Sequence, residues 1–239
     1  MNQSKSLTKG LVVLKEIMTS KKPLTATLLC QKLNIDKSTM SRLITTLIKE
    51  GFIEYVEHSK DIVLSDMLNK TTQKDIREKI IAKTSGLLDE IFYLTNEASY
   101  IGVLDNQSVL YLNQVDKSNR VLKTRDSIGL HAPLHSNAFG KTLLAFENID
   151  LSSIELKKYT SNTIVSIKRL QKELDLIKQR GYAIGDEEHE FGLKSLAVAY
   201  INNRREFIGA IGISGLSARL DERTLHKFGQ KIYRLLNPS

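Results

Sequence analysis

The densest group of titratable side chains in the chain is the run Asp186-Glu187-Glu188-His189-Glu190. Carboxylates and an imidazole this close together could serve as paired acid and base groups or as metal ligands. The spacing supplies no second set of partners, and adjacent residues of a strand point to opposite sides rather than converging. We therefore expect a solvated charge run here, without a catalytic residue.

Two histidines, His131 and His135, form the other pair whose spacing suggests a metal site. Pro133 lies between them and prevents a shared helix, and no cysteine or third spaced ligand follows. The Gly-x-Ser-x-Gly turn of serine hydrolases is absent, and the serines near glycine have no assignable base. The sequence therefore predicts no catalytic site, no metal site and no cofactor.

The segment Gly140-Lys141-Thr142 ends like a phosphate-binding loop. That signature needs a glycine five residues before Gly140, and position 135 is a histidine, which argues against nucleotide binding. What remains is a loop entering a helix, where free backbone N–H groups from about Ala138 to Lys141 could bind a small anion. A tight packing turn that binds nothing is the alternative.

The elements that must position these residues alternate between strands and helices. Apolar patterns predict strands at residues 99–104, 109–114, 195–201 and 208–214, and helices at 73–94, 136–146, 166–180 and 221–236. Hairpins interrupted by helices indicate an antiparallel sheet with helices packed on it, an α+β domain with room for a pocket. The helix at 73–94 would connect this domain to the part of the chain before it.

Residues 23–52 are typical of two short amphipathic helices joined by a tight turn. Asn34 suits a left-handed position at the end of the first helix, and Asp36 is a good N-cap for the second. Each helix has one apolar face, made of Ala26, Leu29, Cys30 and Leu33 in the first and of Met40, Leu43, Ile44 and Leu47 in the second. This pattern predicts a helix-turn-helix, and hence double-stranded DNA as a partner.

The outward face of the second helix carries short hydroxyls and two cations near its N-terminus. Such side chains reach phosphates and base edges when a helix enters a major groove. An ordinary solvated face of a helical hairpin is the alternative. The residues expected to contact DNA are Thr25, Lys37, Ser38, Thr39, Ser41, Arg42 and Thr45, with His58 and Lys60 from the hairpin tip that follows.

Three neighbouring features favour DNA binding. A helix at 6–19 has an apolar stripe able to complete a three-helix core, formed by Leu7, Leu11, Leu14 and Met18. Two short strands at 52–57 and 62–65 form a wing around the tip at 58–61. Residues 1–50 hold nine Lys and Arg against three Asp and Glu, a net charge of +6 in a chain of +8. The cationic excess thus lies where phosphates would be neutralised.

The composition, 41% hydrophobic and 26% charged, is that of an ordinary globular protein. No apolar stretch approaches the ~18 residues that span a bilayer, and the N-terminus lacks the apolar core of a signal peptide. We therefore expect a cytoplasmic protein with no membrane partner, and a core position for the single cysteine, Cys30. Because single winged modules rarely supply enough contacts, we also expect a dimer or tetramer on a pseudo-palindromic operator.

Four separated segments resemble those of the IclR-type transcriptional regulators. Lys37-Ser38-Thr39 with Arg42-Leu43 is similar to the family's Lys-Ser-Thr-x-x-Arg-Leu core. The other matches are the segment 133–145, similar to Pro-Leu-x-x-x-Ala-x-Gly-Lys-x-Leu-Leu-Ala, the segment 181–188, similar to Gly-Tyr-Ala-x-Asp-x-Glu-Glu, and Ile213-Ser214-Gly215 with Arg219-Leu220. The resemblance covers nearly the whole chain. It implies a winged helix-turn-helix domain at 1–65, a linker helix region at 66–94 and a GAF-like effector-binding domain at 95–239.

The resemblance also implies a small-molecule effector, a carboxylate or sugar acid, and a repressor of a catabolic operon. Its pocket would be lined by Ala138, Phe139, Gly140, Asp186, Leu193, Ser195, Gly212 and Ser214. The chain departs from the family where many members have Asp at Gly185, Cys at Ser195 and Ser at Gly212. The competing function is an enzyme of small-molecule metabolism with a basic N-terminal interaction module, but that enzyme would need a catalytic constellation.

Overall fold

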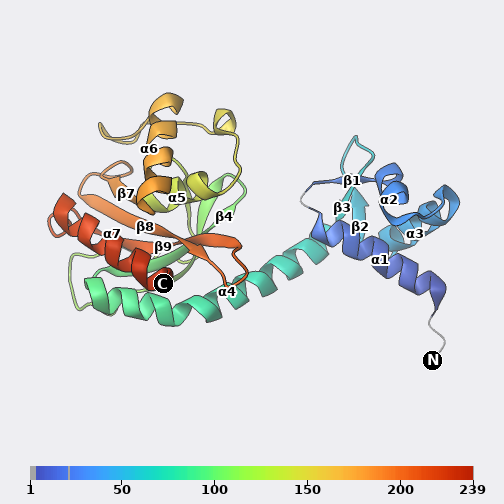
Figure 1. Cartoon of the computed structure of the whole chain (residues 1–239), viewed down its shortest axis with the longest axis horizontal. Coiled ribbons are helices and arrows are strands. Elements are labelled where there is room, and N and C mark those ends of the chain that lie inside the picture. The colour runs from blue at the N-terminus through green and yellow to red at the C-terminus, as the bar shows by residue number, and fades with distance from the viewer. Residues whose placement is uncertain (1–3, 21, 239) are drawn as a thin grey trace. The chain divides into compact units, whose positions relative to one another are not determined.

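The chain divides into two compact units, each with its own hydrophobic core. The structure is a computed structural model and describes residues 4–20 and 22–238 (Figure 1). The first unit covers Met1–Lys79 and the second Ile80–Ser239. This division falls inside a single helix, α4 (Asp66–Thr95), so the two units share one helix.

The first unit combines three helices with a small antiparallel sheet. Its helices are α1 (Lys5–Thr19), α2 (Ala26–Leu33) and α3 (Lys37–Lys49), and its strands are β1 (Leu24–Thr25), β2 (Ile53–Tyr55) and β3 (Asp61–Leu64), in the order β1-β3-β2. Asn34 ends α2 with a left-handed φ of 50°. Asp36 caps α3. The predicted winged helix-turn-helix is therefore confirmed.

The apolar stripe predicted for the first helix does not complete the core. Leu7, Leu11 and Met18 are 63%, 56% and 46% exposed. The buried residues of α1 are Val13 and Ile17, which lie on a neighbouring face of the same helix. Both sets have helical spacing, so periodicity alone could not choose between them. The prediction was wrong for this stripe, apart from Leu14, which packs against the core.

In residues 80–238, six strands form one antiparallel sheet in the order β6-β5-β4-β9-β8-β7. The strands are β4 (Ala98–Asp105), β5 (Ser108–Val115), β6 (His131–Pro133), β7 (Tyr182–Asp186), β8 (Leu193–Ile201) and β9 (Phe207–Leu216). The sequence predicts the four long strands but neither β6 nor β7. The pairing of β4 with β9, with Tyr100 opposite Gly212, places the two predicted hairpins side by side.

Helices cover both faces of this sheet (Figure 1). On one face, α5 (Ala138–Phe146) and α6 (Ile167–Arg180) bury Phe139 and Leu170 against the strands. On the other face, α4 and α7 (Glu222–Leu236) bury Leu88 and Ile232. A short 3-10 turn, Leu151–Ser153, lies between α5 and α6. The predicted α+β class, an antiparallel sheet with packed helices, is confirmed.

Candidate nucleic-acid interface and ligand pocket

Helix α3 presents the polar face that the sequence predicts. Thr39 is half-buried, and the exposed residues are Lys37, Ser38, Ser41, Arg42 and Thr45. Within the described residues, the side chains of Lys37 and Arg42 make no ion pair or hydrogen bond. Two cations near the start of α3 are therefore available to a phosphate or a base edge.

The N-terminus of α3 is held by its cap. The N–H of Thr39 donates to Asp36 Oδ1 at 2.9 Å, and the hydroxyl of Ser38 donates to the same oxygen at 2.7 Å. These hydrogen bonds hold the pKa of the Asp36 carboxyl well below its usual range, and the bond from the N–H of Thr39 has the largest effect. The hydroxyl of Ser38 is thus engaged with the cap.

The other predicted DNA contacts differ in their environment. Thr25 is half-buried and caps α2, since its Oγ1 accepts the N–H of Leu28 at 3.3 Å. His58 and Lys60 are exposed at the tip of the hairpin formed by β2 and β3, where His58 has a φ of 57°. The tip residues are accessible, whereas the oxygen of Thr25 already serves its own helix.

The second unit contains a cavity of about 500 Å³. This volume lies in the range of sites that bury a small organic molecule. Its walls come from β4, β5, β8 and β9, from the loop after β5 and from the segment between β7 and β8. The lining residues combine apolar surface with hydroxyl, cationic, imidazole and carboxylate groups, among them Tyr100, Arg125, Ser136, Glu188, His189 and Ser214.

Three of the eight residues predicted to line a pocket lie in the wall of this cavity: Leu193, Ser195 and Ser214. The structure does not place the other five there, namely Ala138, Phe139, Gly140, Asp186 and Gly212. Four of these five are buried in the fold, and the fifth, Asp186, is exposed and pairs with Lys194 at 2.9 Å. Asp186 instead lines a second, smaller cleft.

The buried residues among these five support the cavity from behind. The ring of Phe139 packs edge-on against Tyr100 and Tyr111, with centroids 5.9 and 5.3 Å apart, and both tyrosines line the cavity. Gly140 packs against the backbone of Leu134, and a Cβ at Gly140 would overlap it. These contacts shape the wall without reaching its surface, so replacing Phe139 would act through the two tyrosines.

Three of the four backbone N–H groups at the start of α5 are already bonded. The N–H of Ala138 donates to Ser195 Oγ at 3.1 Å, and that of Gly140 donates to Asn137 Oδ1 at 2.9 Å. The N–H of Lys141 donates to the carbonyl oxygen of Asn137 at 3.1 Å. Within the described residues, only the N–H of Phe139 has no partner at this turn, so the geometry is closer to the alternative, a capped packing turn.

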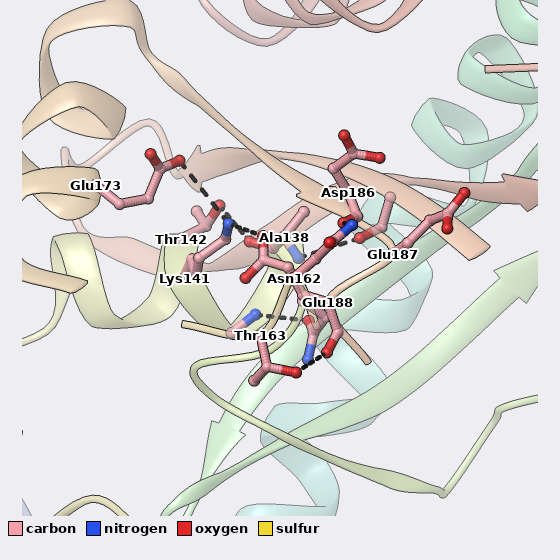
Figure 2. Close-up of polar contacts among 12 residues, drawn as sticks. Ala138, Lys141, Thr142, Asn162, Thr163, Glu173, Asp186, Glu187 and Glu188 are labelled. Atoms are coloured by element: carbon pink, nitrogen blue, oxygen red, sulfur yellow. Dashed lines mark hydrogen bonds and ion pairs between the residues drawn. The ribbon is translucent and has the colours of Figure 1, made fainter. Parts of the chain in front are cut away.

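Figure 2 shows a buried ionic cluster that the sequence does not predict. Lys141 is 1% exposed, and its Nζ donates to the carboxylate of Glu188 and lies 3.8 Å from Glu173. Glu188 is 7% exposed; burial raises its pKa, and the charge of Lys141 opposes that rise. The expectation of a solvated run was wrong for Glu188, whose partner lies 47 residues away in the sequence.

The loop after β5, residues 116–130, is a part of the wall that the sequence does not predict. It contributes Lys123, Thr124 and Arg125 to the cavity. Thr124 anchors it, since its Oγ1 lies 2.5 Å from the hydroxyl of Tyr100. Burial raises the pKa of Tyr100 to about 12, so this hydroxyl stays protonated. The loop has no periodic pattern, and only its contacts in the fold reveal its place.

The two histidines considered for a metal have protein partners. His131 Nε2 lies 2.9 Å from Asp105 Oδ2, and His135 Nε2 lies 2.8 Å from the carbonyl oxygen of Lys157. Among the described residues, no group of three or more His, Cys, Asp or Glu side chains could hold a metal ion. No helix in that part of the chain is long and apolar enough to cross a bilayer.

Two family models match the chain. The model of the IclR helix-turn-helix domain matches residues 6–57, and that of the bacterial transcriptional regulator IclR C-terminal region matches residues 74–235. The chain belongs to the IclR family of transcriptional regulators. The first IclR match contains α3, and the second contains the six-stranded sheet and the cavity.

Curated IclR-family relatives agree with this assignment. The chain is 31% identical over 206 residues to the HTH-type transcriptional regulator KdgR of Dickeya chrysanthemi, covering 84% of this chain and 67% of KdgR. It is 32% identical over 200 residues to the glycerol operon regulatory protein of Streptomyces coelicolor, covering 80% of this chain and 77% of that protein. It is 28% identical over 244 residues to the transcriptional repressor IclR of Escherichia coli, covering 97% and 87%.

Solved structures of IclR-family proteins share the fold. The Thermotoga maritima IclR structure aligns with a TM-score of 0.60 at 24% identity, covering 97% of this chain and 98% of that one. The C-terminal domain of Escherichia coli KdgR aligns with a TM-score of 0.52 at 30% identity, covering 65% and 97%. The chain is thus a DNA-binding transcriptional regulator and not an enzyme, and the competing enzymatic function was wrong.

Proposed function

We propose that this IclR-family protein is a ligand-responsive repressor of a catabolic operon. The observation that carries the proposal is the presence in one chain of a cationic helix face and a cavity of about 500 Å³ lined in part by polar and charged residues. The start of α3 would enter the major groove of the operator, and a small carboxylate or sugar acid would occupy the cavity. Relatives named as a repressor and as an operon regulator support the repressor role.

We further propose that the protein acts in the cytoplasm as a dimer or tetramer. Two copies would place two α3 helices on the half-sites of a pseudo-palindromic operator. Residues 1–65 would bind DNA, residues 95–239 would bind the effector, and residues 66–94 would link these two domains. The effector would then change operator affinity by binding the states of the protein unequally, a linkage between two distinct sites.

The repressor proposal is tested with DNA duplexes that the wild-type protein selects from a random-sequence pool. Fluorescence anisotropy at constant salt measures binding of the selected duplex alone and with glyoxylate, pyruvate, D-gluconate or D-galacturonate at 10 mM. We expect at least one of these acids to lower the apparent affinity at least about tenfold. If all four leave the affinity unchanged, the proposed control by a small carboxylate or sugar acid is wrong.

Replacing Arg42 by alanine is expected to weaken binding of the selected duplex by about 1–3 kcal/mol if Arg42 reaches a base edge. If it contacts only phosphate, the loss is similar for all sequences and the slope of log K against log salt falls by about one. A salt series for both proteins separates the two cases. Arg204→Ala removes the same charge from an exposed turn in the second unit and should leave DNA binding unchanged. Equal affinity of Arg42→Ala and wild type would remove Arg42 from the interface.

A further inference from the structure

The start of α5 offers an anion a single free N–H group within the described residues, that of Phe139, because the N–H groups of Ala138, Gly140 and Lys141 are bonded. The hydroxyl of Ser195 accepts the N–H of Ala138 at 3.1 Å. Gly185 makes room for that hydroxyl, since a Cβ at position 185 would overlap Ser195 Oγ and lie 3.0 Å from the nitrogen of Ala138. A carboxylate that bound a second N–H group here would have to displace an existing hydrogen bond. The charge of a bound acid therefore needs another partner in the cavity.

Arg125 is a cation in the cavity wall that is free to serve as this partner. Its guanidinium makes no ion pair or hydrogen bond within the described residues. The backbone around it is held in place, because the carbonyl oxygen of Arg125 accepts from Gln114 Nε2 at 3.3 Å. The neighbouring Lys123 lies 3.8 Å from Asp116 and is partly neutralised. A guanidinium binds a carboxylate with two parallel hydrogen bonds, which suits Arg125 to an acid.

His189 lies in the same wall and is half-buried. Its Nδ1 is 3.3 Å from the hydroxyl of Ser136, and its ring lies against that of Tyr159 with centroids 4.7 Å apart. When Nδ1 accepts from the Ser136 hydroxyl, the neutral ring carries its proton on Nε2 and can donate it. The two contacts fix the ring in one orientation.

The surroundings of His189 lower its pKa in the free protein. Burial has the largest effect on the pKa of His189 and lowers it. The positive charges of Arg125 and His135 lower this pKa further, whereas the negative charge of Glu190 raises it. Two of these groups, Arg125 and His189, line the cavity and repel each other when both are charged. An anion between them would be attracted to Arg125 and would favour the protonated imidazole.

Glu188 lines the same cavity, but its carboxylate is turned to Lys141 and is closed off from solvent. Its Oε1 accepts from Lys141, whereas its Oε2 is buried and has no hydrogen-bond partner in the described chain. A buried carboxylate oxygen without a partner is costly, so this oxygen adds to the energetic burden of the buried pair. The groups of the lining that suit an acid are therefore a free cation and an imidazole.

We propose that the cavity holds the anionic group of its ligand between Arg125 and His189, and not at the start of α5. The ligand class that fits is a small carboxylic acid, whose carboxylate lies between the guanidinium and the imidazole. This inference rests on the proposed function for the existence of an effector. It adds which residues bind the charged group of that effector.

The test uses the full-length protein and two matched probes, sodium D-gluconate and the uncharged polyol D-glucitol. Calorimetry measures affinity for wild type, Arg125→Gln, Arg125→Lys and Arg204→Gln, which removes the same charge from an exposed turn outside the cavity. We expect Arg125→Gln to lose at least about tenfold in gluconate affinity, which is about 1.4 kcal/mol, and Arg125→Lys to lose less. Arg204→Gln should stay within about twofold of wild type, and glucitol should bind more weakly than gluconate to all but Arg125→Gln.

A second measurement follows the ring of His189 by NMR, assigned with His189→Gln. Gluconate at 100 mM should raise the pKa of His189 relative to sodium chloride of equal ionic strength, and glucitol should leave it unchanged. The proposal is overturned if the pKa does not respond, if Arg125→Gln binds gluconate like wild type, or if Arg204→Gln loses as much affinity as Arg125→Gln. Any of these results leaves the proposed function standing as long as one of the four acids alters operator binding.

Discussion

Replacing Lys141 by methionine is expected to destabilise the second unit by about 3–5 kcal/mol. Methionine keeps an apolar stem of similar length but removes the cation that bonds to Glu188 in the buried cluster of Figure 2. The carboxylate would then remain buried beside Glu173 without its partner, and breaking a buried ion pair from one side costs about this amount. Urea unfolding followed by near-UV circular dichroism measures the loss, since seven of the eight tyrosines follow residue 79.

The stability of the Lys141→Met variant should depend on pH in a definite direction. Burial raises the pKa of Glu188 above the ordinary value of 4.5, and removing Lys141 takes away the charge that opposes this rise. The folded variant then binds a proton more tightly than the unfolded chain does. Its stability should therefore fall as pH rises from about 4.5 through the raised pKa, and recover on acidification.

The matched control for Lys141→Met is the double variant Lys141→Met, Glu188→Leu. Removing both charges leaves no buried carboxylate, so most of the lost stability should return. The cycle formed by the two single variants and the double variant then gives the coupling between the two side chains. Wild-type stability of Lys141→Met at pH 7 would contradict the assignment of a buried ion pair.

Replacing Gly140 by alanine is expected to destabilise the second unit by roughly 2–3 kcal/mol. A Cβ at this position would overlap the backbone of Leu134, which cannot turn away as a side chain can. The better helix propensity of alanine, at most about 1 kcal/mol, cannot offset the forced shift of α5. The urea midpoint followed by near-UV circular dichroism measures the net effect.

Gly86→Ala is the matched control because Gly86 also lies in a helix of the second unit, α4. A Cβ there would meet no heavy atom within 4 Å. Only helix propensity then acts, and the variant should gain about 0.5–1 kcal/mol. Opposite signs for the two glycines are the expected result. If Gly140→Ala were stabilising as well, the close approach of α5 to Leu134 would be wrong.

Local signals account for the parts of the fold that the sequence predicts. Asn34 and Asp36 mark the ends of α2 and α3 through their own backbone preferences and hydrogen bonds, and both act as expected. The hairpin between β4 and β5 turns at Asp105 and Asn106, where a positive φ of 55° at Asn106 suits asparagine. Features of this kind depend on a few adjacent residues, so they can be predicted from a single sequence.

The parts that the sequence does not predict depend on contacts between distant segments. Glu188 is buried together with its partner Lys141, which reaches it from α5. An acidic run in the sequence does not indicate such a distant partner. The stripe of α1 had the correct period but the wrong face, because the choice between Leu11 and Val13 is made by α3 and the strands. The same holds for Arg125, whose loop has no pattern and whose place in the cavity follows only from folding.

The contact between Gly185 and Ser195 has a consequence for how this protein could have diverged from its relatives. Any side chain at position 185 would overlap the hydroxyl of Ser195, so position 185 cannot gain a side chain while that hydroxyl keeps its place. A lineage that replaces Gly185 by a larger residue must first lose or turn the hydroxyl at position 195. Replacing Gly185 first would give a poorly packed intermediate. The order of the two changes therefore matters, and a chimaera that takes a larger residue at 185 should also take its donor's residue at 195.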